Sequence, residues 1–264
     1  MRHALTPLLL LAWSWACGQD QVHDRIQALR LAGGAPARFA LALPADREAP
    51  RATLPQGAQA IAVSAPETER LLRERPALIE FDLPWRERPM RLILTHAGAA
   101  GPAPRLVSSA GDTLAIGDGA TYHGVIDGVP GSLAAFRFTP RGVAGMASAP
   151  ALSTVMVAPL PAGGHAIYPE SAAPIGAGRA GGTRGDPPPR ASGRRSPPGP
   201  PAERCVRIYY EHSHNLFADN NSDLQQTADW IAAVHAILEA LYADEGITIA
   251  FSEAFVWTTP MPFP

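Results

Sequence analysis

The sequence predicts an α+β protein in three parts. Short apolar stretches separated by Gly, Pro and Asp fill residues 19–170, which predicts a mostly-β first unit. Residues 171–203 contain almost no large apolar side chain, which predicts a disordered linker. Residues 204–264 show a strand, a helix and a second strand in turn, which predicts a βαβ unit.

Residues 1–18 have the composition of a signal peptide. A positive start at Arg2 precedes an apolar run from Leu8 to Trp15, and small residues follow at Ala16 and Gly18. This order is typical of secretory signals. The run is shorter than the roughly 20 residues that a mature membrane-spanning helix needs. We therefore expect a secreted or extracytoplasmic protein.

Cys17 raises a lipoprotein alternative, because bacterial lipoproteins are acylated on the cysteine at the cleavage point. The preceding Ser14-Trp15-Ala16 fits that pattern poorly, since Trp15 stands where a small residue is expected. We favour soluble secretion and keep a lipid anchor at Cys17 as the one membrane contact that the sequence suggests. Metabolic labelling with a fatty acid, compared with Cys17→Ala, distinguishes the two.

The first unit is predicted to be rich in strands, with two short helices at Asp24–Leu31 and Glu67–Arg73. The strands are expected at Ala77–Leu83, Met90–Thr95, Arg105–Ser108, Thr121–Ile126, Ser132–Phe138, Gly142–Ala147 and Thr154–Val157. Within residues 121–148, three of these strands are joined by two turns that contain Gly and Pro. This segment should form a β-meander.

The linker at residues 171–203 is basic, and all 22 basic residues of the chain are Arg. A flexible, exposed and basic segment is a good protease target. Arg194 and Arg195 are the candidate processing site, and a plain spacer is the equally weighted alternative. The formal net charge of −2 gives no case for nucleic-acid binding.

The second unit should begin with a strand at Cys205–Tyr210 and a polar loop at Glu211–Asn221. Ser222, with Gln225 three residues later, predicts a capping box that starts a helix running to about Tyr242. Gly246 should end that helix. A strand over residues 247–257 follows, parallel to the first. Alone, such a unit would have an exposed edge and little core, so we expect it to be marginal by itself.

Candidate ligands in this unit have simpler interpretations. His212 and His214 could face one metal, but without a third ligand we expect them to be solvated loop residues. His235 should be a packing or boundary residue, and His123, in the meander of the first unit, is given no role. The acidic and amide cluster of Asp219, Asn220, Asn221 and Asp223 lacks the glycine and distal Glu of a calcium loop, so turn and capping roles are expected. Cys205 should be an inert buried residue.

The segment from Arg204 to Pro264 resembles the start of the catalytic domain of reprolysin-like metalloproteases, a branch of the metzincins. The matching pieces are the first strand ending in Tyr210-Glu211, the helix with Gln226-Thr227, the turn Leu241–Ile247, and the strand closing on Phe255-Val256-Trp257. Upstream, TYHGVIDGVPGSLAAFRF resembles the meander of reprolysin-type pro-regions. The order of signal, pro-region, linker and catalytic start is also the order in the family.

This resemblance implies a truncated precursor of a secreted zinc-dependent endopeptidase that acts on protein or peptide substrates. Residues 19–170 would be the pro-region, and residues 204–264 the N-terminal part of the metalloprotease domain. The family binds zinc through H-E-x-x-H-x-x-G-x-x-H. No H-E-x-x-H occurs in this chain, so no catalytic or metal residue is carried over. We expect the 264-residue chain to bind no zinc and to be inactive.

The alternative function is a non-enzymatic exported β domain that binds or inhibits a partner, possibly as the lipoprotein above. It requires no chemistry from residues 204–264. It predicts that the chain is stable and zinc-free when expressed as given.

Overall fold

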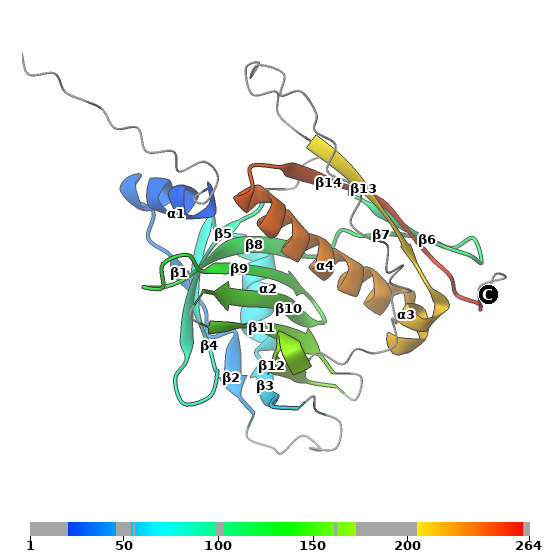
Figure 1. Ribbon diagram of the computed structural model, residues 1–264, viewed down its shortest axis with the longest axis horizontal. Helices are drawn as coiled ribbons and strands as arrows, with labels where there is room; N and C mark the ends of the chain where they lie inside the picture. Colours follow the sequence, from blue (N-terminus) through cyan, green and yellow to red (C-terminus); the bar gives the residue numbers. More distant parts are fainter. Residues whose placement is uncertain are drawn as a thin grey trace, which may run out of the picture.

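The computed structural model describes residues 21–45, 54, 56–98, 103–150, 152–160, 163–172 and 205–260. The predicted signal peptide with Cys17, and nearly all of the predicted linker with Arg194 and Arg195, lie outside these residues. The described part is an α+β fold with mostly strands and few helices (Figure 1). The predicted fold class is confirmed at this level.

Ten strands of the described residues form one large curled sheet, called sheet A here. The pairs are antiparallel except for β1 and β4, which are parallel. In spatial order the strands are β1 (Ala37–Arg38), β4 (Leu78–Leu83), β5 (Met90–His96), β8 (Ala120–Ile126), β9 (Leu133–Thr139), β10 (Gly142–Ala149), β11 (Leu152–Pro159), β12 (His165–Pro169), β3 (Gln59–Val63) and β2 (Ala42–Pro44).

The two ends of sheet A meet at a single segment of the chain. Residues 37–44 begin as β1 beside β4 and continue as β2 beside β3. Between them, Phe39 N–H donates to Glu80 O at 2.9 Å, and Ser64 N–H donates to Leu41 O at 2.9 Å. One segment therefore hydrogen-bonds to both edges, and both edges lose most of their unpaired backbone groups.

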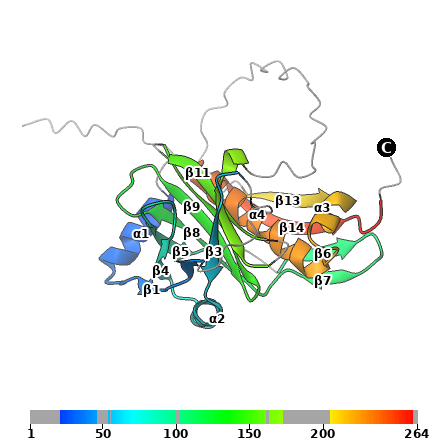
Figure 2. The ribbon, with the colours of Figure 1, turned by 90° about the horizontal axis from the view of Figure 1, so that it is seen from below.

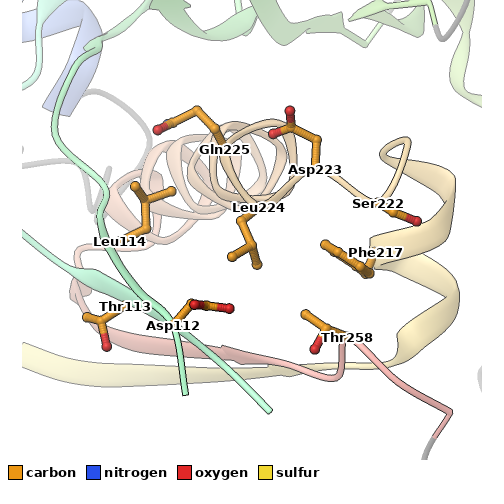
Figure 3. A pocket seen from close by; sticks show the side chains of 9 residues that line it. All are labelled: Asp112, Thr113, Leu114, Phe217, Ser222, Asp223, Leu224, Gln225 and Thr258. Carbon is orange, nitrogen blue, oxygen red and sulfur yellow. The ribbon is translucent and has the colours of Figure 1, made fainter. Parts of the chain in front are cut away.

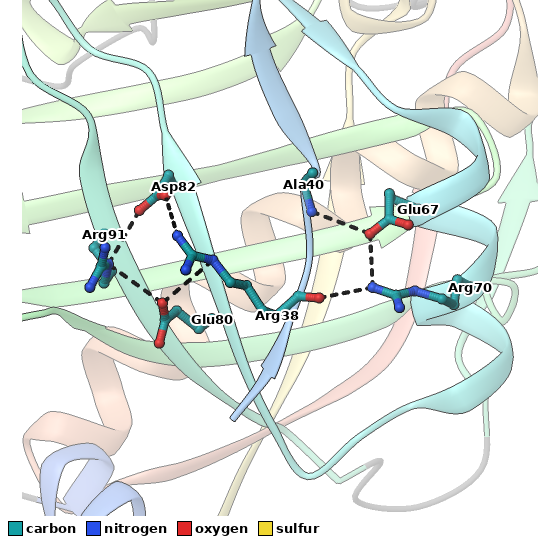
Figure 4. A network of polar contacts seen from close by, with 7 residues as sticks. All are labelled: Arg38, Ala40, Glu67, Arg70, Glu80, Asp82 and Arg91. Atoms are coloured by element: carbon teal, nitrogen blue, oxygen red, sulfur yellow. Dashed lines mark hydrogen bonds and ion pairs between the residues drawn. The ribbon is translucent and has the colours of Figure 1, made fainter. Parts of the chain in front are cut away.

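Charged side chains reinforce this closure on the β1–β4–β5 surface (Figure 4). Arg38 lies 3.1 Å from Asp82 and 3.9 Å from Glu80, while Arg91 lies 3.5 Å from Glu80 and 3.4 Å from Asp82. The arginines are 65% and 48% exposed, so each pair contributes little by itself. The four side chains place opposite charges beside one another across β1, β4 and β5.

Helix α2 (Ala65–Glu74) begins beside residues 37–44, the segment that joins the two ends of sheet A. Ser64 is its N-cap, and the Ser64 side chain accepts from Glu67 N–H. Glu67 then accepts from Ala40 N–H at 3.2 Å, and Arg70 donates to the Arg38 carbonyl at 2.8 Å (Figure 4). Leu71, fully buried, anchors the helix in the sheet's inner core. The helix expected at Glu67–Arg73 is confirmed and is slightly longer.

Aromatic rings fill the inner core of sheet A. Phe81 makes edge-on contacts with Phe136 and Phe138 at centroid distances of 5.6 and 6.0 Å, and Tyr122 meets Phe138 edge-on at 5.7 Å. The Tyr122 hydroxyl donates to the Pro76 carbonyl at 3.1 Å, which satisfies its polar end. All four rings are almost wholly buried, so the curl encloses a packed interior.

Helix α1 (Gln21–Leu31) covers the opposite face of sheet A. Its Val22 and Ile26 pack with Leu78 and Ile93 in a second cluster. The helix predicted at Asp24–Leu31 is therefore confirmed and starts three residues earlier. The predicted meander is also confirmed, because β8, β9 and β10 are consecutive and antiparallel.

A second sheet, sheet B, has four strands among the described residues, in the order β13, β14, β6 and β7. Strands β13 (Cys205–His212), β14 (Thr248–Val256) and β6 (Arg105–Ser108) are parallel, and β7 (Thr113–Ala115) is antiparallel to β6. The predicted parallel pairing of β13 and β14 is confirmed. The hairpin of β6 and β7 belongs in sequence to the first unit, yet it extends the sheet of the second.

Helix α4 (Leu224–Asp244) connects β13 to β14 and lies between the two sheets (Figures 1 and 2). It contacts β9, β10 and β8 of sheet A and β14 of sheet B. Four buried alanines recur at every fourth position: Ala228, Ala232, Ala236 and Ala240. Such a row of small side chains allows close approach to neighbouring elements.

The start of α4 differs from prediction. The expected loop at Glu211–Asn221 is wrong, since β13 runs on to His212 and a short helix α3 (His214–Asp219) follows. Ser222 does not cap α4, because its φ of +53° places it in the turn before the helix. Asp223 is the cap, and its carboxylate accepts from Gln226 N–H at 2.8 Å. Gly246 follows the helix with φ +71°, as predicted.

Gly142 should be intolerant of any side chain. It opens β10 at φ +139°, and a Cβ there would collide with the ring of His165, whose Nε2 accepts from Val143 N–H at 3.2 Å. We expect Gly142→Ala to lower the free energy of unfolding by about 2–4 kcal/mol in urea titrations. Gly128→Ala is the matched control, because Gly128 has φ +72° and open space around it. It should cost about 1 kcal/mol. Equal losses would show that the contact with His165 is unimportant.

Candidate functional site

The carboxyl ends of the three parallel strands of sheet B meet at one edge, beside the N-terminus of α4. In open α/β sheets, ligands bind outside this edge. A shallow crevice of about 520 Å³ lies there (Figure 3). Its lining residues come from the β6–β7 hairpin, α3, the start of α4 and the end of β14: Asp112, Thr113, Leu114, Phe217, Ser222, Asp223, Leu224, Gln225 and Thr258.

The crevice's two carboxylates already have partners. Asp112 accepts from the Ser108 hydroxyl at 3.1 Å, and Asp223 caps α4. None of the nine lining residues is His, Cys, Lys or Arg. The crevice therefore has hydroxyls and apolar side chains to offer a ligand, but no nucleophile paired with a base.

The other chemistry-bearing cluster is the polar contact of α4 with both sheets. On the sheet B side, the Tyr210 hydroxyl lies 2.9 Å from His235 Nδ1, and the Phe251 ring lies 4.9 Å from the His235 ring. Burial lowers the pKa of His235 to about 4, with a smaller contribution from the positive charge of Arg137. His235 is thus a buried packing residue, as predicted, and holds its place through Tyr210.

On the sheet A side, His123 of β8 faces Glu239 of α4. His123 Nε2 lies 3.7 Å from the Glu239 carboxylate and has no hydrogen-bond partner among the described residues. Burial lowers the pKa of His123 to about 4 and raises that of Glu239 to about 7, although Arg25 and Arg137 oppose the second shift. Near pH 6 the contact is therefore a neutral imidazole facing a neutral carboxylic acid.

Two arginines complete this interface. Arg141, in the β9–β10 turn, forms an ion pair with Asp229 of α4. Arg137 of β9 is largely buried and donates to the Thr121 hydroxyl at 3.2 Å. Burial lowers the pKa of Arg137 and raises that of Asp229, against the opposing effect of the neighbouring Arg141. The Arg141–Asp229 ion pair therefore joins the first unit to the second at a partly exposed position.

His212 and His214 are not the solvated loop residues that the sequence predicted. The His212 ring stacks on Tyr210 at 5.9 Å and meets the edge of Trp230 at 5.9 Å, and burial lowers its pKa. His214 lies beside Phe217 in α3. The prediction failed because β13 continues to His212 and carries that ring under α4. His212 and His214 therefore each make aromatic contacts within the second unit, at partly buried positions.

Among the residues that the structure describes, no three His, Cys, Asp or Glu side chains are placed to hold a metal ion. The described residues therefore do not fit the zinc ion that the family resemblance implies. Asp223 and Asn220 have the capping and turn roles expected, with the Asn220 amide donating to the Leu216 carbonyl at 2.8 Å. No described helix is both long and apolar enough for a membrane span.

Sequence reasoning missed the interface residues His123, Arg137 and Glu239, and the placement of the β6–β7 hairpin. The four-residue repeat of alanines in α4 could have indicated a helix with one closely packed face. No local pattern marks the pairing of β6 with β14, because 148 residues separate Arg105 from its partner Glu253. Comparison of the chain with known protein families and with curated proteins finds no match.

The buried carboxyl of Glu239 should make stability depend on pH. Its pKa is about 7 in the fold and 4.5 ordinarily, so the folded chain loses stability as pH rises from 4.5 to 7. Glu239→Gln removes this loss. We expect the variant to be more stable than wild type by about 1–3 kcal/mol at pH 8 in urea titrations, and nearly equal to it at pH 4.

The matched control is Glu245→Gln, at the exposed C-terminal end of the same helix. It should follow the wild-type curve at both pH values. The three buried histidines His123, His165 and His235 act oppositely, since pKa values of about 4 remove stability as pH falls below 6.5. If Glu239→Gln gave no gain at pH 8, the carboxyl would not be buried as described.

Proposed function

We propose that this chain is the N-terminal part of a secreted zinc-dependent endopeptidase precursor of the reprolysin-like type. Residues 19–170 are its pro-region, and residues 204–264 begin its catalytic domain. The proposal draws on the sequence resemblance and on the parallel β13–α4–β14 unit, which has the predicted order and direction. The zinc-binding residues and the substrate cleft belong to sequence beyond Pro264.

One observation carries the role of the first unit. Helix α4 and strand β14 would open the catalytic domain. Strands β8, β9 and β10 of the first unit pack against α4, and β6 of the first unit pairs with β14. Residues 19–204 contain no cysteine, so the proposed pro-region has no thiolate that could bind the catalytic zinc ion and inhibit it. Latency in this chain is therefore steric. The pro-region holds the first elements of the catalytic domain by packing and strand pairing.

Release requires cleavage between the two units. The basic linker at residues 171–203, with Arg194 and Arg195, is the proposed processing segment. An export signal at residues 1–18 would place the precursor outside the cytoplasm, where a processing protease can reach it.

The precursor function predicts a specific continuation of the reading frame. We expect the DNA after the Pro264 codon to encode H-E-x-x-H-x-x-G-x-x-H, and the extended protein to cleave casein in a zinc-dependent manner once the linker is cut and the first unit is removed. The 264-residue chain should show no cleavage. An Arg194→Ala/Arg195→Ala variant of the extended protein, compared with Arg190→Ala as control, should remain latent. Absence of the zinc motif in every downstream frame would remove the basis of the proposal.

The alternative is a non-enzymatic exported binding or inhibitory domain. The observation that favours it is the interlocking of the two units, because the β6–β7 hairpin of the first unit shares a buried core with α4 and β14 of the second. A stable, zinc-free 264-residue protein together with a downstream sequence lacking the zinc motif would select this alternative.

A further inference from the structure

The hairpin of β6 and β7 leaves the sheet to which its neighbours in sequence belong. It lies in the chain between β5 and β8, which pair directly with each other in sheet A. The hairpin does not insert between them. It joins sheet B, beside β14 of the second unit, as Figure 1 shows.

Its backbone and side chains are bound to β14 along the whole of β6. The register runs from Arg105 opposite Glu253 to Ser108 opposite Val256. Arg105 forms a 2.8 Å ion pair with Glu253. Beyond the strand end, Ser109 N–H donates to the Val256 carbonyl at 2.9 Å.

The Ser109 hydroxyl adds a second connection, since it accepts from Thr258 N–H at 3.0 Å. This bond lies at the exit of β14. The hairpin is thus tied to the second unit both along the strand and past its end.

The hairpin also supplies core to the second unit. Leu106 is 1% exposed and Ile116 is 5% exposed, and both belong to the cluster built around Ile231, Ala254 and Val256. Without the hairpin, these three residues would lose their apolar neighbours on one side. The backbone groups of β14 that face β6 would also be unpaired, which is costly for a buried strand.

We propose that the β6–β7 hairpin is a strand donor: the first unit lends β6 to sheet B, and residues 205–260 keep their fold only while it is in place. The partner of this surface is the second unit of the same chain. It follows that the two units stay associated after the linker is cut. Cleavage alone therefore does not release residues 204–264, the proposed start of the catalytic domain, from the first unit. This last consequence rests on the proposed function, whereas the strand donation does not.

The test uses the full chain, with a recognition sequence for a specific protease inserted between Arg194 and Arg195. After cleavage, the two pieces are analysed by size-exclusion chromatography at neutral pH. We expect them to elute together and to separate only when urea unfolds them. Separation in buffer alone overturns the proposal.

Two proline substitutions within the hairpin isolate the strand pairing. Ser109 N–H faces β14, and Ser108 N–H faces the hairpin, where it donates to the Asp112 carbonyl at 2.9 Å. Because successive N–H groups alternate between the two sides of a strand, Val107 N–H also faces β14. Val107→Pro removes that donor and places a ring against β14.

Thr113→Pro is the matched control. Ile116 N–H donates inward to the Pro104 carbonyl, so by the same alternation Thr113 N–H faces the outer edge of β7. We expect Val107→Pro to weaken association of the cleaved pieces by about tenfold or more, and Thr113→Pro to leave it unchanged. Equal behaviour of the two variants overturns the proposal.

A charge exchange between Arg105 and Glu253 tests the same β6–β14 pairing if Val107→Pro does not fold. Arg105→Glu places two carboxylates opposite each other on the surface, and should weaken association by about threefold. The double variant Arg105→Glu/Glu253→Arg restores the opposite charges and should restore association. Failure of the double variant to recover contradicts β6–β14 pairing. A missing zinc motif downstream would refute the proposed function and leave these results intact.

Discussion

The packing of α4 between two sheets is the constraint on which the rest of this structure depends. The helix belongs in sequence to the second unit, yet one side of it lies on β8, β9 and β10 of the first. Its row of buried alanines leaves little side-chain bulk on one face of the helix. Sheet B can then pack on the remaining side, and its edge at β14 is covered by β6. Two units that the sequence separates by a long linker thereby share one interior.

This arrangement places ionisable groups at buried and partly buried positions. His123, Glu239 and Arg137 lie at the contact between units, and each has its pKa displaced by burial. Groups of this kind cost stability unless they are paired, so they fix how α4 sits on sheet A more than they strengthen the contact. The proposed steric hold by the first unit needs such a defined contact, since residues 19–204 have no cysteine to bind zinc. The proposed latency and the polar interface are consistent with each other on this ground.

Much of the local structure could be predicted from the sequence. Alternating apolar residues in Met90–Thr95 and the Gly and Pro turns of residues 121–148 identified strands and a meander that the structure confirms. Local rules failed at Ser222, because the positive φ of Asn221 and Ser222 moved the cap to Asp223. They failed again at His212, whose surroundings come from Tyr210 and Trp230. The pairing of β6 with β14 joins distant residues, and no short-range periodicity reports it. The structure does not test the proposed zinc site, because the H-E-x-x-H motif does not occur in these 264 residues.

Native-state hydrogen exchange tests the central claim most directly, because it reports the free energy of opening for each element separately. If the two units share one interior, amides in the middle of α4 and β14 should exchange only through global unfolding. Their opening free energies would then equal those of β8 and β9, and would fall equally with urea. Exchange of α4 and β14 through a separate opening of lower free energy, with β8 and β9 still protected, would contradict the account.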